Sequence, residues 1–187
     1  MNAYQKASVL VGLVSFAPMY RSILKGRSQN IASWVLWSLI AGITASSLIA
    51  EHGNHAIASA YTAGNLSVAI LIMRSKRVEW TWFESAVTTL VVVCLIIWLI
   101  LGARAATVAS TTAHITAGIA QLKDSYIRPR ETSVIAYSGW MTADILSVIG
   151  GKDWSIEERL FPTAIAIYSL LVVLAASRLS WQKLFRP

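Results

Sequence analysis

Charged residues are scarce in this sequence of 187 residues: they make up 13% of it, and only nine of them are acidic. Soluble domains usually carry about 25% charged residues, so a chain that is 56% hydrophobic does not read as a water-soluble globule. Cysteine occurs once, at Cys94, inside an apolar run. A single thiol cannot form an intrachain disulfide or complete a metal cluster. The composition therefore argues against a soluble globular domain and a disulfide scaffold.

Motifs of common enzymes are also missing. The sequence has no glycine-rich phosphate loop, nucleophile elbow, Cys-x-x-Cys or His-Glu-x-x-His motif. The last apolar stretch, residues 155–176, contains no lysine, which a retinal Schiff base requires. His52 and His55 have a His-x-x-His spacing on a predicted turn, but two imidazoles alone are a weak metal signal. We therefore expect no enzyme, no cofactor and no metal site.

Apolar stretches dominate what is present. A membrane-spanning helix needs roughly 20 mostly apolar residues, and the hydropathy pattern predicts seven such helices. They cover residues 6–24, 31–50, 55–73, 83–102, 105–124, 133–150 and 156–177. We therefore predict an all-α integral membrane protein with seven transmembrane helices in a lipid bilayer.

The basic residues are distributed unevenly between the two ends of these spans. Twelve of the 16 lysines and arginines fall on the side of the C-terminus. The other four, Lys6, Arg104, Lys152 and Arg159, fall on the side of the N-terminus. The positive-inside rule then predicts an N-terminus outside and a C-terminus in the cytoplasm. Membrane topology also explains the net charge of +7, so we expect no nucleic acid as a partner.

A weak internal repeat relates the first three spans to the last three. Residues of similar kind recur at an offset of 103: Ser22 and Ser125, Lys25 and Arg128, Trp34 and Tyr137, and Trp37 and Trp140. A parallel repeat of two three-helix units requires an odd linker helix between them. We therefore predict a first three-helix repeat (1–78), a linker helix (79–104) and a second three-helix repeat (105–187).

The first repeat also carries local motifs. Phe16-Ala17-Pro18-Met19 is followed by Lys25-Gly26-Arg27-Ser28, and Ser33 and Trp37 open the second span. Together with the plan of three, one and three helices, these residues resemble the SWEET and PQ-loop transporter superfamily, including its single-repeat SemiSWEET members. Pro18 corresponds to the proline of the family's Pro-Gln pair, although Met19 stands where the family has glutamine.

The resemblance implies positions for a site and for gates. Asn65, in the middle of the third span, corresponds to a substrate-binding asparagine of the family. Pro18, which deletes a backbone hydrogen bond, and Gln121, the remnant of a second Pro-Gln pair, correspond to hinge or gate positions. The residue 103 positions after Asn65 is Tyr168, so the second binding asparagine of the family is replaced here.

Polar residues follow one face of each of two predicted spans. In the fifth span they are Thr107, Thr111, His114, Gly118, Gln121 and Ser125, and in the sixth Ser133, Tyr137, Trp140, Asp144, Ser147 and Gly151. Spacings of three and four residues place them on one helix face. Because polar groups avoid hydrocarbon, we expect both faces to point into the bundle. We expect Trp37 and Trp140 themselves to pack near the membrane interface.

Asp144 and His114 are the ionisable residues near the middle of these spans. An unpaired carboxylate at that depth costs roughly 2.5 to 3.5 kcal/mol even on the mild insertion scale, so Asp144 must face protein or water. An Asp and a His in a medium of low dielectric suit a proton relay. Asn65, Tyr61, His114 and Asp144 form our candidate substrate-binding set, and we expect Asn65, His114 and Asp144 to line one central cavity. Helix-locking hydrogen bonds and core packing remain the alternative roles.

The most specific function that these observations favour is transport. We predict a membrane transporter that moves a small polar solute by alternating access through a central site at the membrane midplane, with proton coupling left open. The missing hinge prolines of the family favour an alternative, which is a non-transporting receptor of the same architecture or an accessory subunit. For either function, the sequence leaves open a homo-oligomer or a place in a larger membrane complex.

The predicted topology can be tested with reporters. A reporter fused after Pro187 should read cytoplasmic, and one inserted at Gly53 should read external, because the basic residues are concentrated on the side of the C-terminus. The measurement compares phosphatase activity with fluorescence in paired fusions at each position. A C-terminus outside the cytoplasm would contradict the whole assignment of spans.

Overall fold

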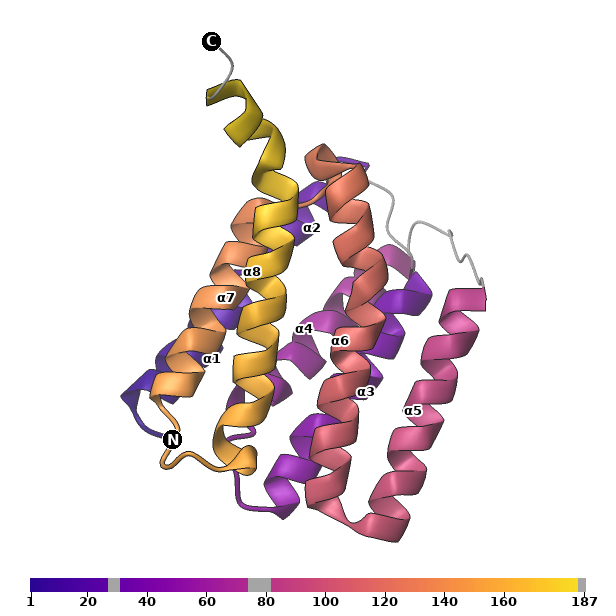
Figure 1. Cartoon of the computed structure of the whole chain (residues 1–187), viewed down its shortest axis with the longest axis vertical. Helices are drawn as coiled ribbons and strands as arrows, with labels where there is room; N and C mark the ends of the chain where they lie inside the picture. Colours follow the sequence, from indigo (N-terminus) through magenta and orange to yellow (C-terminus); the bar gives the residue numbers. More distant parts are fainter. Residues whose placement is uncertain (27–30, 74–81, 185–187) are drawn as a thin grey trace.

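The computed structural model describes residues 1–26, 31–73 and 82–184, and within these ranges the chain forms α-helices, one short 3-10 helix and no strand (Figure 1). The elements are α1 (Ala3–Val14), α2 (Phe16–Leu24), α3 (Ile31–Ala50), α4 (Ala56–Met73), α5 (Trp82–Leu101), α6 (Ala103–Ile127), the 3-10 helix η1 (Pro129–Glu131), α7 (Val134–Ile149) and α8 (Ile156–Leu184). Each predicted span corresponds to one α-helix, or to α1 and α2 together, and begins within three residues of the predicted start.

Five helical segments are long and apolar enough to cross a membrane. They are Ala3–Leu24, Ile31–Ala50, Ala56–Met73, Trp82–Leu101 and Ile156–Arg178. Of the other two helices, α7 is apolar but only 16 residues long, and α6 has 25 residues but carries the predicted polar face. The all-α fold is thus confirmed for the described residues, and its long apolar helices are compatible with a multi-pass membrane protein.

The third helix of each group of three lies between the other two. In the first triplet, which we define as α1 with α2, α3 and α4, helix α4 packs against both α1 and α3. In the second triplet, α6, α7 and α8, helix α8 packs against both α6 and α7. The triplets meet where α1 packs on α7 and α3 on α6, while α5 lies at the edge against α3 and α6 (Figure 1).

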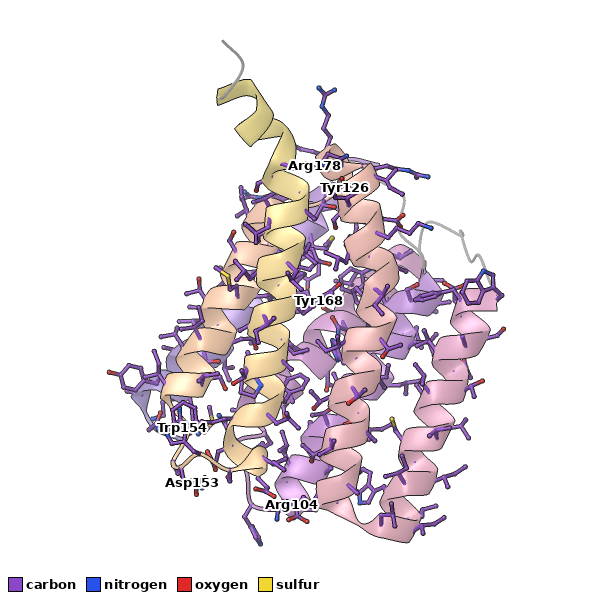
Figure 2. The ribbon with its side chains drawn as sticks, viewed as in Figure 1. Arg104, Tyr126, Asp153, Trp154, Tyr168 and Arg178 are labelled. Atoms are coloured by element: carbon purple, nitrogen blue, oxygen red, sulfur yellow. The ribbon has the colours of Figure 1, made fainter. Side chains whose placement is uncertain are left out.

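The turns gather at two ends of the bundle. The N-terminus, the α3–α4 turn and the α7–α8 connection share one end, which we call the N-terminal end (Figure 1). Figure 2 shows Arg104, Asp153 and Trp154 at this end, and Tyr126 and Arg178 at the opposite end. The predicted boundary between residues 78 and 79 lies outside the described residues. So do five of the basic residues, Arg27, Arg74, Lys76, Arg77 and Arg186.

The first span is interrupted near its middle. Helix α1 ends at Val14 and α2 begins at Phe16, with Ser15 between them. Pro18 lacks the N–H that would bond the carbonyl of Val14, four residues earlier, so the helix is weakened at this point. The hydroxyl of Ser15 instead donates to the carbonyl of Val11 at 2.6 Å. The interruption at Ser15 thus lies about one turn before Pro18.

Buried hydroxyls join the two triplets between α3 and α6. Thr44 donates to Ser110 at 2.8 Å, and the hydroxyls of Ser47 and Thr107 lie 2.8 Å apart. All four side chains are buried. The polar face of α6 points into the bundle, as predicted, because there its hydroxyls find partners that hydrocarbon cannot offer.

A glycine allows α6 and α8 to approach each other closely. A Cβ atom at Gly118 would lie 2.6 Å from the ring of Tyr168, whose hydroxyl donates to the Gly118 carbonyl at 3.1 Å. At Gly42, on α3, a Cβ would lie 3.6 Å from its nearest neighbour, which is an ordinary contact.

The surroundings of these two glycines predict opposite effects for their substitution by alanine. We expect Gly118→Ala to destabilise the protein by about 1–3 kcal/mol through overpacking, and Gly42→Ala to be neutral or stabilising because alanine favours helices by up to about 1 kcal/mol. Thermal unfolding of the purified protein in detergent measures the difference. Equal unfolding midpoints for the two variants would contradict the close packing of Tyr168 on α6.

Candidate functional site

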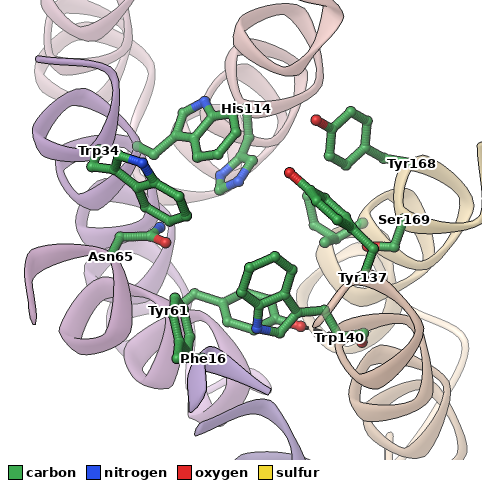
Figure 3. A pocket seen from close by; sticks show the side chains of 11 residues that line it. Phe16, Trp34, Tyr61, Asn65, His114, Tyr137, Trp140, Tyr168 and Ser169 are labelled. Carbon is green, nitrogen blue, oxygen red and sulfur yellow. Dashed lines mark hydrogen bonds between the residues drawn. The ribbon is translucent and has the colours of Figure 1, made fainter. Parts of the chain in front are cut away.

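A cavity lies at the centre of the bundle, between the two triplets (Figure 3). Most of its lining is aromatic: Phe16, Trp34, Trp37, Tyr61, Tyr137, Trp140 and Tyr168. The remaining lining residues are Asn65, His114, Ile165 and Ser169. Its volume of about 40 Å³ leaves room for about three water molecules. The space that the structure leaves between the rings is therefore small.

Asn65 and His114 reach the cavity from opposite triplets, as the sequence predicted. Asn65 comes from α4 and His114 from α6 (Figure 3). The imidazole of His114 stacks on Trp37, with ring centroids 6.3 Å apart, and its Nδ1 is buried without a hydrogen-bond partner. The wall thus offers an amide and an imidazole among the rings, and both groups can form hydrogen bonds.

Asp144 does not line the cavity directly, which corrects the expectation that it would. The carboxylate is fully buried on α7 behind Tyr61, and the Tyr61 hydroxyl donates to its Oδ2 at 2.9 Å. The other oxygen, Oδ1, is buried without a partner. Tyr61 also lines the cavity, so it links Asp144 to this space. The bond joins α4 of the first triplet to α7 of the second.

The two predicted gate residues lie in different surroundings. Pro18 follows the break between α1 and α2, two residues from Phe16 of the cavity wall. Gln121 lies in the last two turns of α6, where its amide donates to Ser125 at 3.2 Å, and it is not among the lining residues. The structure brings Pro18, and not Gln121, close to the candidate site.

The N-terminal end is closed by hydrogen bonds between the triplets. The Asn54 amide donates to the Ser147 hydroxyl at 3.0 Å and to the Glu158 carbonyl at 3.4 Å. That carbonyl is free because Pro162, four residues later, has no N–H to donate. Asn2 likewise donates to the carbonyl of Gly150 at 2.7 Å. These contacts hold the α3–α4 turn and the N-terminus against α7 and α8.

A second cavity of about 380 Å³ lies at the same end, and Gln5, Asn54 and Lys152 are among its lining residues. His52 and His55 of the His-x-x-His turn also line it. Among the described residues there is no group of three or more side chains that could hold a metal ion.

Hydrogen bonds from Ser155 and the nearby charges of Arg159 and Lys152 keep the pKa of the exposed Asp153 below its usual value.

The chain matches no family model, no curated protein and no solved structure.

Several lining residues were not predicted as site residues. Trp37 and Trp140, which we expected to pack near the membrane interface and not to belong to a site, both line the central cavity. The internal repeat in the sequence does point to these lining residues. Three pairs at the offset of 103 lie on this wall: Trp34 and Tyr137, Trp37 and Trp140, and Asn65 and Tyr168.

Access to the cavity can be tested by cysteine labelling. In a Cys94→Ala background, we expect Asn65→Cys to react with a small charged methanethiosulfonate reagent, because water reaches the cavity when it opens. Leu66→Cys, on the outer surface of α4, is the matched control. It should stay unmodified, because charged reagents do not enter hydrocarbon. An unreactive Asn65→Cys would identify a sealed, dry core and favour the accessory role.

Proposed function

We propose that this protein is a membrane transporter that moves a small polar solute by alternating access through the central cavity. The observation that supports this most directly is the place of the cavity. It lies between the two triplets, midway along helices long enough to span a membrane, and it carries hydrogen-bonding groups from both sides. Transporters built from repeats bind their solutes at such an interface.

The helix contacts support a repeat of three-helix units. If α1 with α2 corresponds to α6, α3 to α7 and α4 to α8, each observed packing has a counterpart. The contact of α1 with α7 matches that of α6 with α3, and the position of α4 matches that of α8. We therefore propose units 1–78 and 105–187 with 79–104 as linker, in the manner of the SWEET and PQ-loop superfamily that the sequence resembles.

Alternating access requires the closed N-terminal end to open. The bonds of Asn54 to Ser147 and Glu158, and of Asn2 to Gly150, all cross from one triplet to the other. These hydrogen bonds would break when the solute enters from this side. By the distribution of basic residues, this side faces away from the cytoplasm.

Asp144 is the group that would bind and release a proton during transport. Its bond to Tyr61 joins the two triplets, so a change in its charge would alter the contact between them. A buried carboxylate is stable as an ion only with hydrogen bonds or a counter-charge, and its Oδ1 has neither in this structure. Gain and loss of a proton at Asp144 would therefore be coupled to the relative position of the triplets. His114, on the other side of the cavity, is the second candidate for the relay.

The second candidate function is an accessory subunit or a non-transporting receptor. The small volume of the cavity favours it, as does the exposed, apolar face of α5, which packs only against α3 and α6 among the described elements. In that case Asp144 would only lock helices together.

Asp144→Asn separates these functions. Asparagine keeps the volume and a hydrogen bond to Tyr61 but cannot carry a charge, so we expect a folded protein whose uptake of solute into proteoliposomes is lost or no longer driven by a pH gradient. The rate is measured per monodisperse molecule, with solutes first selected by thermal-shift screening. Asp153→Asn, a change of an exposed carboxylate, is the control and should behave as wild type. If Asp144→Asn also behaves as wild type at every pH, the proton relay is wrong and the accessory role is preferred.

A further inference from the structure

The side-chain charges near the central cavity are unbalanced: a carboxyl group lies close to its wall, and none of the described basic side chains lines it. No lysine or arginine side chain of the described residues lines it. The Asp144 carboxylate, in contrast, lies one hydrogen bond behind the wall, at 2.9 Å from the Tyr61 hydroxyl. An anionic solute placed here would lose its hydration, gain no counter-charge and lie close to a carboxylate. The charges of the site therefore select against anions.

The aromatic rings of the wall meet edge to face. Trp34 and Trp37 meet at 76°, Tyr137 and Trp140 at 89°, and Tyr137 and Tyr168 at 71°. Rings arranged at such angles form the walls of a box around one space, as the close view shows (Figure 3). Indole and phenol faces attract cations that lie over them, tryptophan most strongly.

We propose that the solute of this cavity is a small organic cation of the quaternary ammonium type, held by the ring faces with Asp144 as its counter-charge. This inference rests on the proposed function, because it names the class of solute that the transporter would move. Asn65 and Ser169 supply neutral polar contacts for a hydroxyl elsewhere on the same molecule.

Binding of such a cation would compete with binding of a proton at Asp144. An ionised Asp144 has a counter-charge when the cation is present, whereas a protonated Asp144 needs none. Affinity should therefore rise with pH until the carboxyl group has lost its proton. The other titratable groups of the wall are Tyr61 from α4, His114 from α6, Tyr137 from α7 and Tyr168 from α8. Protonation of His114 would also repel a cation, so its effect has to be separated from that of Asp144.

Choline and its carbon isostere provide the test. Isothermal titration of the purified full-length protein would compare choline with 3,3-dimethylbutan-1-ol, which has the same shape without the charge, and with the anion 3,3-dimethylbutyrate. We expect choline to bind on the order of tenfold more tightly than the neutral isostere, and the anion not to bind. Equal affinity for choline and the isostere, or preference for the anion, would overturn the proposal.

Five variants test which residues are responsible for choline binding and for its dependence on pH. Trp37→Leu should weaken choline binding on the order of tenfold, while Trp154→Leu, at an exposed tryptophan of the N-terminal end, should leave it unchanged. Asp144→Asn should weaken binding and remove its dependence on pH, and Tyr61→Phe tests the same link if Asp144→Asn does not fold. A pH dependence that survives Asp144→Asn but disappears in His114→Gln would overturn the role of Asp144.

Transport in proteoliposomes separates this inference from the proposed function. Binding of choline without any uptake would support the cation site and contradict a transporter. Uptake of an uncharged polar solute without choline binding would support a transporter and contradict the cation site.

Discussion

In a bundle with an apolar outer surface, polar side chains find hydrogen-bond partners on other helices only in the interior. Leu99 is 86% exposed and Ile135 74%, whereas Thr107 and Asp144 are fully buried. Hydrocarbon offers no hydrogen bonds, so α6 and α7 turn their polar faces toward the first triplet, where α6 bonds to α3 and α7 to α4. The rest of the arrangement, including the central cavity, follows from this constraint.

The same constraint decides which residues join the two triplets. At the centre, Tyr61 of α4 reaches across to Asp144 of α7, and large rings from both sides fill the space around them. Several of these rings meet edge to face, which is a preferred geometry of aromatic pairs, and a small cavity remains between them. The structure thus places a buried acid next to a space lined by aromatic rings.

Two prolines interrupt backbone hydrogen bonding at points where the triplets touch. Near Pro18 the first span breaks, and Phe16 just after the break lies on the cavity wall. Pro162 frees the carbonyl of Glu158, which then accepts from Asn54 of the other triplet. Each missing intrahelical bond thus lies next to the boundary between the triplets, at the cavity wall near Pro18 and at the Asn54 contact near Pro162.

The sequence by itself determined the helices, because apolar runs of spanning length are local and hydropathy reads them directly. It also determined the inward faces of α6 and α7, since helical periodicity alone brings Thr107, His114 and Asp144 onto these faces. Only the tertiary structure decided that Trp37 and Trp140 line the cavity, that Asp144 lies behind Tyr61, and that Asn54 closes the N-terminal end. These features depend on contacts between residues 79 to 104 positions apart, or on which neighbour a helix face meets. No local pattern of residues encodes such contacts, because they arise only when the helices pack.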